Sequence, residues 1–94
     1  MVRVLIERRI SEGMVEAYNL ALREMRLQAV QKAGYISGES LRDVTDPFHY
    51  VVISTWNAAS DWNAWFQSEA RRTVLAKIAP MLQEPERITV LEPV

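Results

Sequence analysis

The chain has 94 residues, of which 49% are hydrophobic, and its formal net charge is −1. This length and apolar content predict one folded domain spanning residues 1–94 rather than a disordered segment. The absence of cysteine excludes a disulfide framework and a thiolate metal site. The basic residues are scattered along the chain, which argues against a nucleic-acid partner.

The sequence has no recognisable membrane segment or secretion signal. No apolar run approaches the length of a membrane span, and the N-terminus lacks the apolar core of a signal peptide. We therefore expect a cytoplasmic protein with no membrane partner. His49 is the one histidine, and a single imidazole does not build a histidine-rich metal centre, so we expect no metal site.

The N-terminal segment, residues 2–10, alternates apolar and polar residues with the period of a strand that buries one face. A helix is expected next, beginning at Ser11 or Glu12 and ending before Gly34, because glycine suits the left-handed position after a last turn. Its sheet-facing stripe is predicted to be Met14, Tyr18, Ala21, Leu22, Met25 and Ala29.

Residues 35–44 and 48–56 predict two antiparallel strands joined by a short turn. Asp46 and Pro47 form the turn, since proline fixes the backbone for a tight reversal. The second strand is rich in β-branched and aromatic residues, whereas Gly38 interrupts the first and indicates a bulge or a sheet edge.

A second helix is expected to begin near Ser60 or Asp61 and to bend or break at Pro80. We interpret the pair Arg71 and Arg72 as part of its solvated face. A last strand is predicted over residues 87–93. The sheet-facing residues of the helix are predicted to be Trp62, Trp65, Phe66, Glu69, Ala70 and Thr73, with Val74, Leu75, Ile78 and Leu82 in the turns that follow.

The order strand, helix, strand, strand, helix, strand predicts an α+β domain of the ferredoxin-like type. Its four strands would form an antiparallel sheet, and both helices would cover one face. The strand at 49–56 is apolar on both sides, so the other face of the sheet also needs a cover. A second copy of the chain is the simplest cover, and we expect a homodimer packed sheet against sheet.

Several motifs taken in order resemble the antibiotic biosynthesis monooxygenase (ABM) family of dimeric α/β barrels. They are "GY" at 34–35, "DP" at 46–47, Tyr50, "STW" at 54–56 and "W..W..SE" at 62–69, and the resemblance covers residues 2–92. The family includes cofactor-free oxygenases of anthrones and quinols and haem-degrading oxygenases. The resemblance implies the fold more specifically than it implies an activity.

The haem-degrading branch is similar in having a tryptophan at the place of Trp65. Its members also use an asparagine in the first strand and a histidine that binds the iron about ten residues after that tryptophan. Here the asparagine position falls on Ile6 or Glu7 and the histidine position falls near Leu75. We therefore expect neither haem nor another cofactor.

The three tryptophans lie within ten residues of one another and pose a choice between core and pocket. Trp56 and Trp62 are interpreted mainly as core packing, with Trp62 placed as a lid. Trp65 matches the family position and is predicted to wall a substrate pocket, although core packing is an equal alternative. We predict a pocket made by Trp65, Trp62, Arg8 and Ile6. Arg8 either holds an anionic oxygen at the pocket mouth or emerges at the end of the sheet.

His49 and Tyr18 are the candidate catalytic residues, because an imidazole or a phenol can manage a proton. Each also has a structural alternative, as an exposed strand residue or a core tyrosine. The predicted function is a domain that binds a small aromatic molecule, with cofactor-independent monooxygenation of a phenol, quinol or anthrone as the activity to test. The alternative is a non-catalytic dimeric binding or regulatory module, and the sequence does not identify the ligand.

Overall fold

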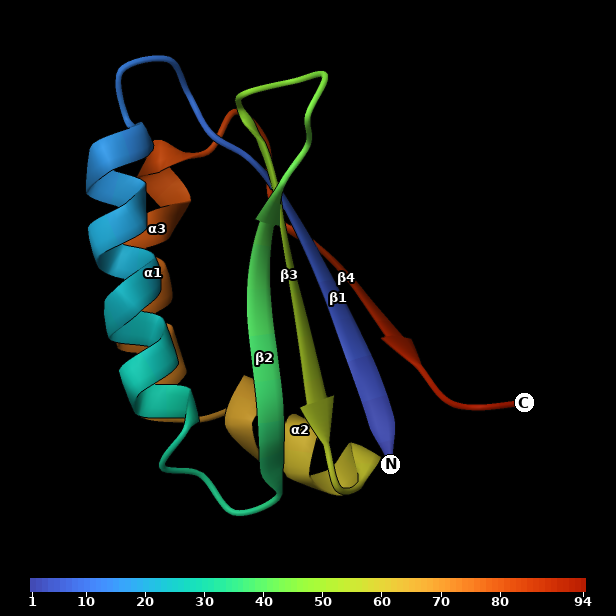
Figure 1. Ribbon diagram of the computed structural model, residues 1–94. Coiled ribbons are helices and arrows are strands. Elements are labelled where there is room, and N and C mark those ends of the chain that lie inside the picture. The colour runs from blue at the N-terminus through green and yellow to red at the C-terminus, as the bar shows by residue number, and fades with distance from the viewer.

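The computed structural model describes residues 1–94 as one antiparallel four-stranded sheet with three helices packed against one face (Figure 1). The spatial order of the strands is β2-β3-β1-β4, so β1 and β3 are central and β2 and β4 form the edges. The elements along the chain are β1 (Val2–Arg9), α1 (Val15–Ala29), β2 (Tyr35–Arg42), β3 (His49–Trp56), α2 (Ala59–Phe66), α3 (Glu69–Ile78), the 3₁₀ turn η1 (Ala79–Met81) and β4 (Arg87–Leu91). The ferredoxin-like arrangement is therefore confirmed.

The alternation predicted for β1 is present. Val2, Val4 and Ile6 are buried against the helices, whereas Arg3 is exposed and Leu5 half-buried on the opposite face. β1 pairs with β3 and β4 on its two sides, and Ile6 stands opposite both Val52 and Ile88. This side of the sheet carries the core, and it is also the side on which the pocket forms.

α1 begins three or four residues later than the sequence indicated. The expected start at Ser11 or Glu12 is wrong because residues 11–14 form a turn, in which the Met14 N–H donates to the Ser11 carbonyl and Gly13 has a φ of +85°. The helix runs from Val15 to Ala29. Its predicted stripe is confirmed, with Tyr18, Ala21, Met25 and Ala29 buried and Met14 and Leu22 packed against the core.

The predicted second helix is two helices with a break between them. α2 ends at Phe66, and α3 begins at Glu69 with Ser68 as its N-cap, whose Oγ accepts a hydrogen bond from the Arg71 N–H at 3.2 Å. The break changes the phase of the buried face. Trp62 and Trp65 remain buried in α2, but the buried residues of α3 are Arg71, Val74 and Ile78 rather than Glu69 and Thr73.

The break predicted at Pro80 is present, because α3 ends at Ile78 and η1 contains Pro80. β2 is an edge strand, as one interpretation of Gly38 predicted, and its bulge lies between Tyr35 and Ser37. β2 and β4 each end two residues earlier than expected.

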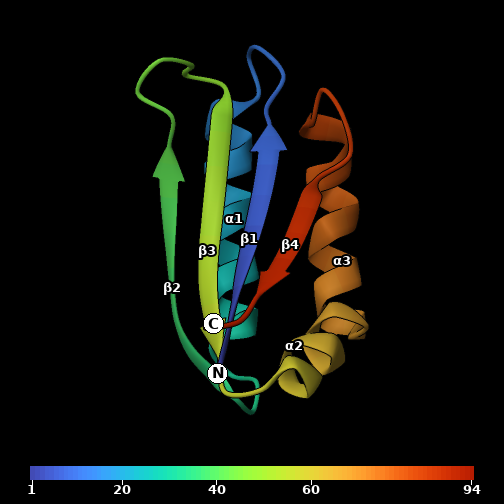
Figure 2. The ribbon, with the colours of Figure 1, turned by 90° about the vertical axis from the view of Figure 1, so that its right-hand side faces the viewer.

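The other face of the sheet has no cover within the chain (Figure 2). Leu5 and Ile53 are neighbours across β1 and β3 on this face, and Leu41 and Val51 are neighbours across β2 and β3. These side chains are half-buried or exposed. We call this surface the outer face. Arg3, Glu7, Arg9 and His49 lie on the same face, so these apolar side chains form a patch among charged residues.

Candidate functional site

A small pocket with an open mouth lies between the helices and the sheet, and its cavity volume is about 50 Å³. Strands β1, β2 and β3 provide its floor, and α1, α2 and α3 provide its walls. Its lining is mostly apolar and aromatic, with a few polar groups, which is the usual character of a small-molecule site. The residues used below are Ile6, Arg8, Trp56, Trp62, Trp65 and Arg71.

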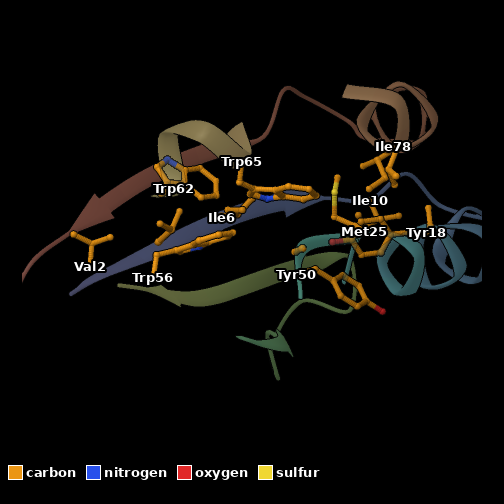
Figure 3. Packing of buried hydrophobic residues seen from close by; sticks show 14 residues of the cluster. Val2, Ile6, Ile10, Tyr18, Met25, Tyr50, Trp56, Trp62, Trp65 and Ile78 are labelled. Carbon is orange, nitrogen blue, oxygen red and sulfur yellow. The ribbon is translucent and has the colours of Figure 1, made fainter. Parts of the chain in front are cut away.

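The three tryptophans form one aromatic cluster at the pocket (Figure 3). Trp56 and Trp65 are stacked, with ring centroids 6.4 Å apart and an angle of 22° between the planes. Trp62 meets Trp56 edge to face at 6.0 Å. All three are at most 4% exposed, so each is core and pocket wall at once. Burial and pocket lining are therefore not exclusive for these three residues.

The indole N–H groups differ in what they bind. Trp56 Nε1 donates to the Ser54 hydroxyl at 3.1 Å, which satisfies it within β3. The indole N–H groups of Trp62 and Trp65 make no hydrogen bond to the protein, yet no fully buried polar atom lacks a partner. Both N–H groups are therefore partly accessible, and both tryptophans line the pocket.

Two buried arginines share one carboxylate beside the tryptophans. Arg8 Nη2 lies 2.9 Å from Glu86 Oε1 and Arg71 Nη2 lies 2.9 Å from Glu86 Oε2. The side chains of Arg8 and Arg71 are 2% and 3% exposed, and that of Glu86 is 11% exposed. We call these three residues the arginine cluster. Arg8 Nη1 also donates to the Tyr18 hydroxyl at 3.1 Å.

The cluster is held in place by aromatic rings as well as by charge. The Arg71 guanidinium lies over the rings of Trp62 and Phe66, 5.6 and 5.1 Å from their centroids, at cation–π distance. Burial by itself would raise the pKa of Glu86, but the charges of Arg8 and Arg71 outweigh it and hold the pKa below its usual range. Glu86 is therefore ionised at neutral pH.

Four of the six predicted site residues meet at this pocket. Trp65, Trp62, Arg8 and Ile6 all line it. Arg8 does not emerge at the end of the sheet, since it is 2% exposed. Tyr18 is fully buried behind Arg8 and is not part of the pocket lining.

His49 lies apart from the pocket, on the outer face of the sheet. Its Nδ1 is 3.0 Å from Asp43 Oδ2, and its Nε2 is 3.5 Å from Glu7 Oε1, which is also on that face. The hydrogen bond with His49, together with bonds from Thr45, lowers the pKa of Asp43 well below its ordinary range. The structure therefore does not bring His49 together with Trp65, and the sheet lies between them.

Sequence reasoning missed Arg71 and Glu86. The pair Arg71 and Arg72 predicts a solvated helix face, which is the usual position of adjacent arginines, but Arg71 is 2% exposed. The signal was Ser68, an N-capping residue followed by Glu69, which marks a new helix start. Because a new helix begins at Glu69, Arg71 lies on the same buried face of that helix as Val74 and Ile78. Glu86 precedes β4 in a loop and had no signal in the sequence.

The fold and the pocket define a class, the ferredoxin-like α+β domains with an aromatic pocket between helices and sheet. Within it, residues 1–77 match the family model "Antibiotic biosynthesis monooxygenase". The chain therefore belongs to the ABM family, as its motifs suggested. No curated protein matches it in sequence. No helix is both long and apolar enough to cross a bilayer, and no group of three or more potential side-chain ligands is arranged for a metal ion.

Several solved structures share this fold. A candidate antibiotic biosynthesis monooxygenase from Nitrosomonas europaea superposes with a TM-score of 0.90 at 18% identity, covering 100% of this chain and 99% of that one. Rv0793 from Mycobacterium tuberculosis gives 0.89 at 17%, covering 99% and 94%. SnoaB from Streptomyces nogalater, described as a cofactor-independent oxygenase, gives 0.86 at 10%, covering 99% and 93%. At these identities the likeness establishes the fold alone.

Proposed function

We propose that this ABM domain binds a flat aromatic phenol, quinol or anthrone in the pocket beneath Trp65. The observation that carries the proposal is the stacked pair of Trp56 and Trp65 beside an open pocket. Aromatic walls favour a planar ligand, since rings gain from stacking beyond the area that they bury. The similarity of the fold to SnoaB, described as a cofactor-independent oxygenase, also supports this proposal.

The reaction proposed for this pocket is cofactor-independent monooxygenation. An ionised quinol or anthrone is rich enough in electrons to reduce O₂ directly. With an anthrone, the methylene group becomes a carbonyl, one oxygen atom of O₂ enters the product and the other leaves as water. The protein then needs to exclude water, orient the ring and stabilise negative charge on the substrate oxygen. We propose Arg8, which lines the pocket, for the last of these tasks.

Proton transfer by Tyr18 or His49 has little geometric support. Tyr18 reaches the pocket only through Arg8, and His49 is on the other side of the sheet. This observation favours the second candidate function, a binding module that holds an aromatic ligand without transforming it. The two functions predict the same binding step and differ only after O₂ is admitted.

Titration with menadiol under nitrogen tests the proposed function. We expect saturable binding by calorimetry, at least tenfold weaker in Trp65→Phe, whose smaller ring loses stacking area. Ile78→Val is the matched control, because Ile78 is fully buried but outside the pocket. It should lower the melting temperature and leave menadiol affinity unchanged.

Admitting O₂ then separates the two candidate functions. Faster consumption of O₂ with the protein than without it, lost in Trp65→Phe, supports the oxygenase. Binding without such acceleration supports the binding module. Absence of saturable binding for menadiol, anthrones and flavonoid-like phenols alike would overturn both.

We also infer that the protein is a homodimer through the outer face. The support is the row of Leu5, Ile53, Val51 and Leu41 left uncovered on that face. A sheet with two apolar faces is stable in water only when both are covered. A second copy offers the same apolar surface and so completes the cover.

A further inference from the structure

The pocket is smaller than the ligand proposed for it. A cavity of about 50 Å³ holds only a few water molecules, since one water needs roughly 10–15 Å³. Sites for small organic molecules usually measure roughly 300–1,000 Å³. A quinol with two fused rings therefore enters only if part of the pocket wall moves outward.

The mouth of the pocket lies between α1 and β2. The exposed residues of the lining are Arg26 on α1 and Gly38 and Glu39 on β2, whereas the lining residues of β1, α2 and α3 are all buried. Figure 2 shows α3 on the β4 side of the sheet and α1 nearer to β2. The mouth is therefore bounded by one helix and by one edge strand.

Of the elements around the pocket, β2 is weakly held. It pairs with β3 alone, whereas β1 and β3 are paired on both sides and α1 packs along α3. Tyr35 and Ser40 are half-buried, and every other residue of β2 is exposed. An outward shift of β2 thus exposes little apolar surface, which is the usual property of a segment that opens locally.

One hydrogen bond spans the mouth. The Arg26 Nη2 donates to the Ser40 Oγ at 3.1 Å, and no other hydrogen bond or ion pair joins a side chain of α1 to one of β2. Because this bond is exposed, water can replace either partner when the two elements separate. Gly38 has no side chain to close the mouth when this bond breaks.

We propose that aromatic ligands enter the pocket between α1 and β2, and that the Arg26–Ser40 hydrogen bond is the latch of this entrance. The latch breaks as β2 moves away from α1, and it forms again once the ring has reached the tryptophans. This inference rests on the proposed function and adds the route of entry. Closing the latch also excludes water from the ligand, which the proposed reaction requires.

Quenching of tryptophan fluorescence by acrylamide tests the latch without a ligand. All three tryptophans line the pocket, so the fluorescence of this chain reports on this site. We expect Ser40→Ala to raise the quenching constant by roughly two- to tenfold, because losing one hydrogen bond raises the open population. Ser37→Ala is the matched control, since Ser37 is exposed on the same strand and its side chain makes no hydrogen bond. Equal quenching of the two variants would overturn the latch.

A second variant removes the same hydrogen bond from the helix side. Arg26→Leu should raise the quenching constant as Ser40→Ala does, and the double variant should be no more quenched than either single one. Additive effects would mean that the two side chains act independently, and would contradict a shared latch.

Stopped-flow binding of menadiol under nitrogen tests the route of entry. Ser40→Ala should raise the association and dissociation rate constants together, because the latch opposes passage in both directions. A rise in dissociation alone would identify Ser40 as a ligand contact and would contradict the latch. If menadiol does not bind the unmodified chain, the proposed function fails and ligand entry with it, whereas the quenching result still decides whether Arg26 and Ser40 close the mouth.

Crosslinking the mouth completes the test. The chain has no cysteine, so Arg26→Cys combined with Ser40→Cys gives one pair of thiols for a short bis-methanethiosulfonate reagent. We expect the crosslinked protein to exclude menadiol and the reduced protein to bind it. Binding to the crosslinked protein at the unmodified rate would overturn entry between α1 and β2.

Discussion

Gly34 is a residue at which backbone geometry and packing act together. It has a φ of +84°, and a Cβ at this position would overlap the side chain of Asp61. Gly13 has nearly the same φ, +85°, but has nothing within 4 Å of the corresponding position. Comparing alanine substitutions at the two glycines therefore separates the energetic cost of a left-handed backbone from the cost of a steric clash.

We predict that Gly13→Ala costs about 1–2 kcal/mol, the penalty of an L-residue in the left-handed region. Gly34→Ala should cost about 1–3 kcal/mol more, because the added methyl group must displace the Asp61 side chain at the start of α2. Urea unfolding of both variants measures the difference. Equal losses of stability would show that Asp61 moves aside without cost.

Glu86 makes the stability of the domain depend on pH. Its pKa is lowered on folding from an ordinary value of 4.5, so its ionised form stabilises the fold above that pH. The contribution is lost as pH falls through the lower folded-state pKa. At pH 7 we predict that Glu86→Gln is destabilised by about 3–5 kcal/mol, since it leaves two buried cations without a carboxylate.

Thermal unfolding of Glu86→Gln between pH 7 and pH 3 measures this effect. Its deficit relative to the unmodified chain should be constant near neutrality and shrink below about pH 4.5. Glu24→Gln is the control, because Glu24 pairs with Lys77 at 3.1 Å on the surface, and its loss should cost less than about 1 kcal/mol. A deficit that does not change with pH would contradict this origin of the stability.

At the scale of elements, the break between α2 and α3 determines what faces the pocket. The Ser68 hydroxyl donates to the Trp65 carbonyl at 2.7 Å and accepts from the Arg71 N–H at 3.2 Å. One side chain thus ends the helix that carries Trp65 and begins the helix that carries Arg71. Were the two helices continuous, Arg71 would point away from Glu86.

We predict that Ser68→Ala lowers stability by about 0.5–2 kcal/mol, the usual cost of losing an N-cap. It should also weaken the binding of menadiol, because Arg71 lines the pocket and loses its anchor. Ser60→Ala is the control, since Ser60 is exposed and makes no hydrogen bond through its side chain. If the two substitutions had equal effects in urea unfolding and in titration, Ser68 would have no special role in capping α3 or in positioning Arg71.

At the scale of the whole molecule, the outer face governs assembly. We predict that Ile53→Lys, in the middle of that face, converts a dimer to a monomer at micromolar concentration, as measured by light scattering. The free-energy cost of burying an unpaired lysine in the interface exceeds the free energy gained from the remaining contacts between the two copies. Leu20→Lys is the control, because Leu20 is 65% exposed on α1, away from the outer face. A monomeric unmodified chain would contradict the dimer directly.

The strands and their faces were predictable from the sequence because a period of two is unambiguous over eight residues, as Val2, Val4 and Ile6 illustrate. The start of α1 and the break at Ser68 were missed because both depend on local turns within a segment of helical composition. The break at Ser68 places Arg71 on the buried face, whereas the sequence predicted it on the solvated face. One of the two buried arginines that share Glu86 was therefore overlooked. Glu86 could not be placed from its local sequence, because only the tertiary fold brings it between Arg8 and Arg71.

The most direct test of the account is a titration with menadiol under nitrogen, followed by NMR of the indole and guanidinium N–H groups. We predict that the Trp65 Nε1–H and Arg71 Nε–H resonances shift together and saturate with one binding constant. The Trp56 Nε1–H, which donates to Ser54, should move least and serves as an internal reference. Saturable shifts confined to residues outside the pocket, or no shifts at all, would contradict an aromatic-binding site beneath Trp65.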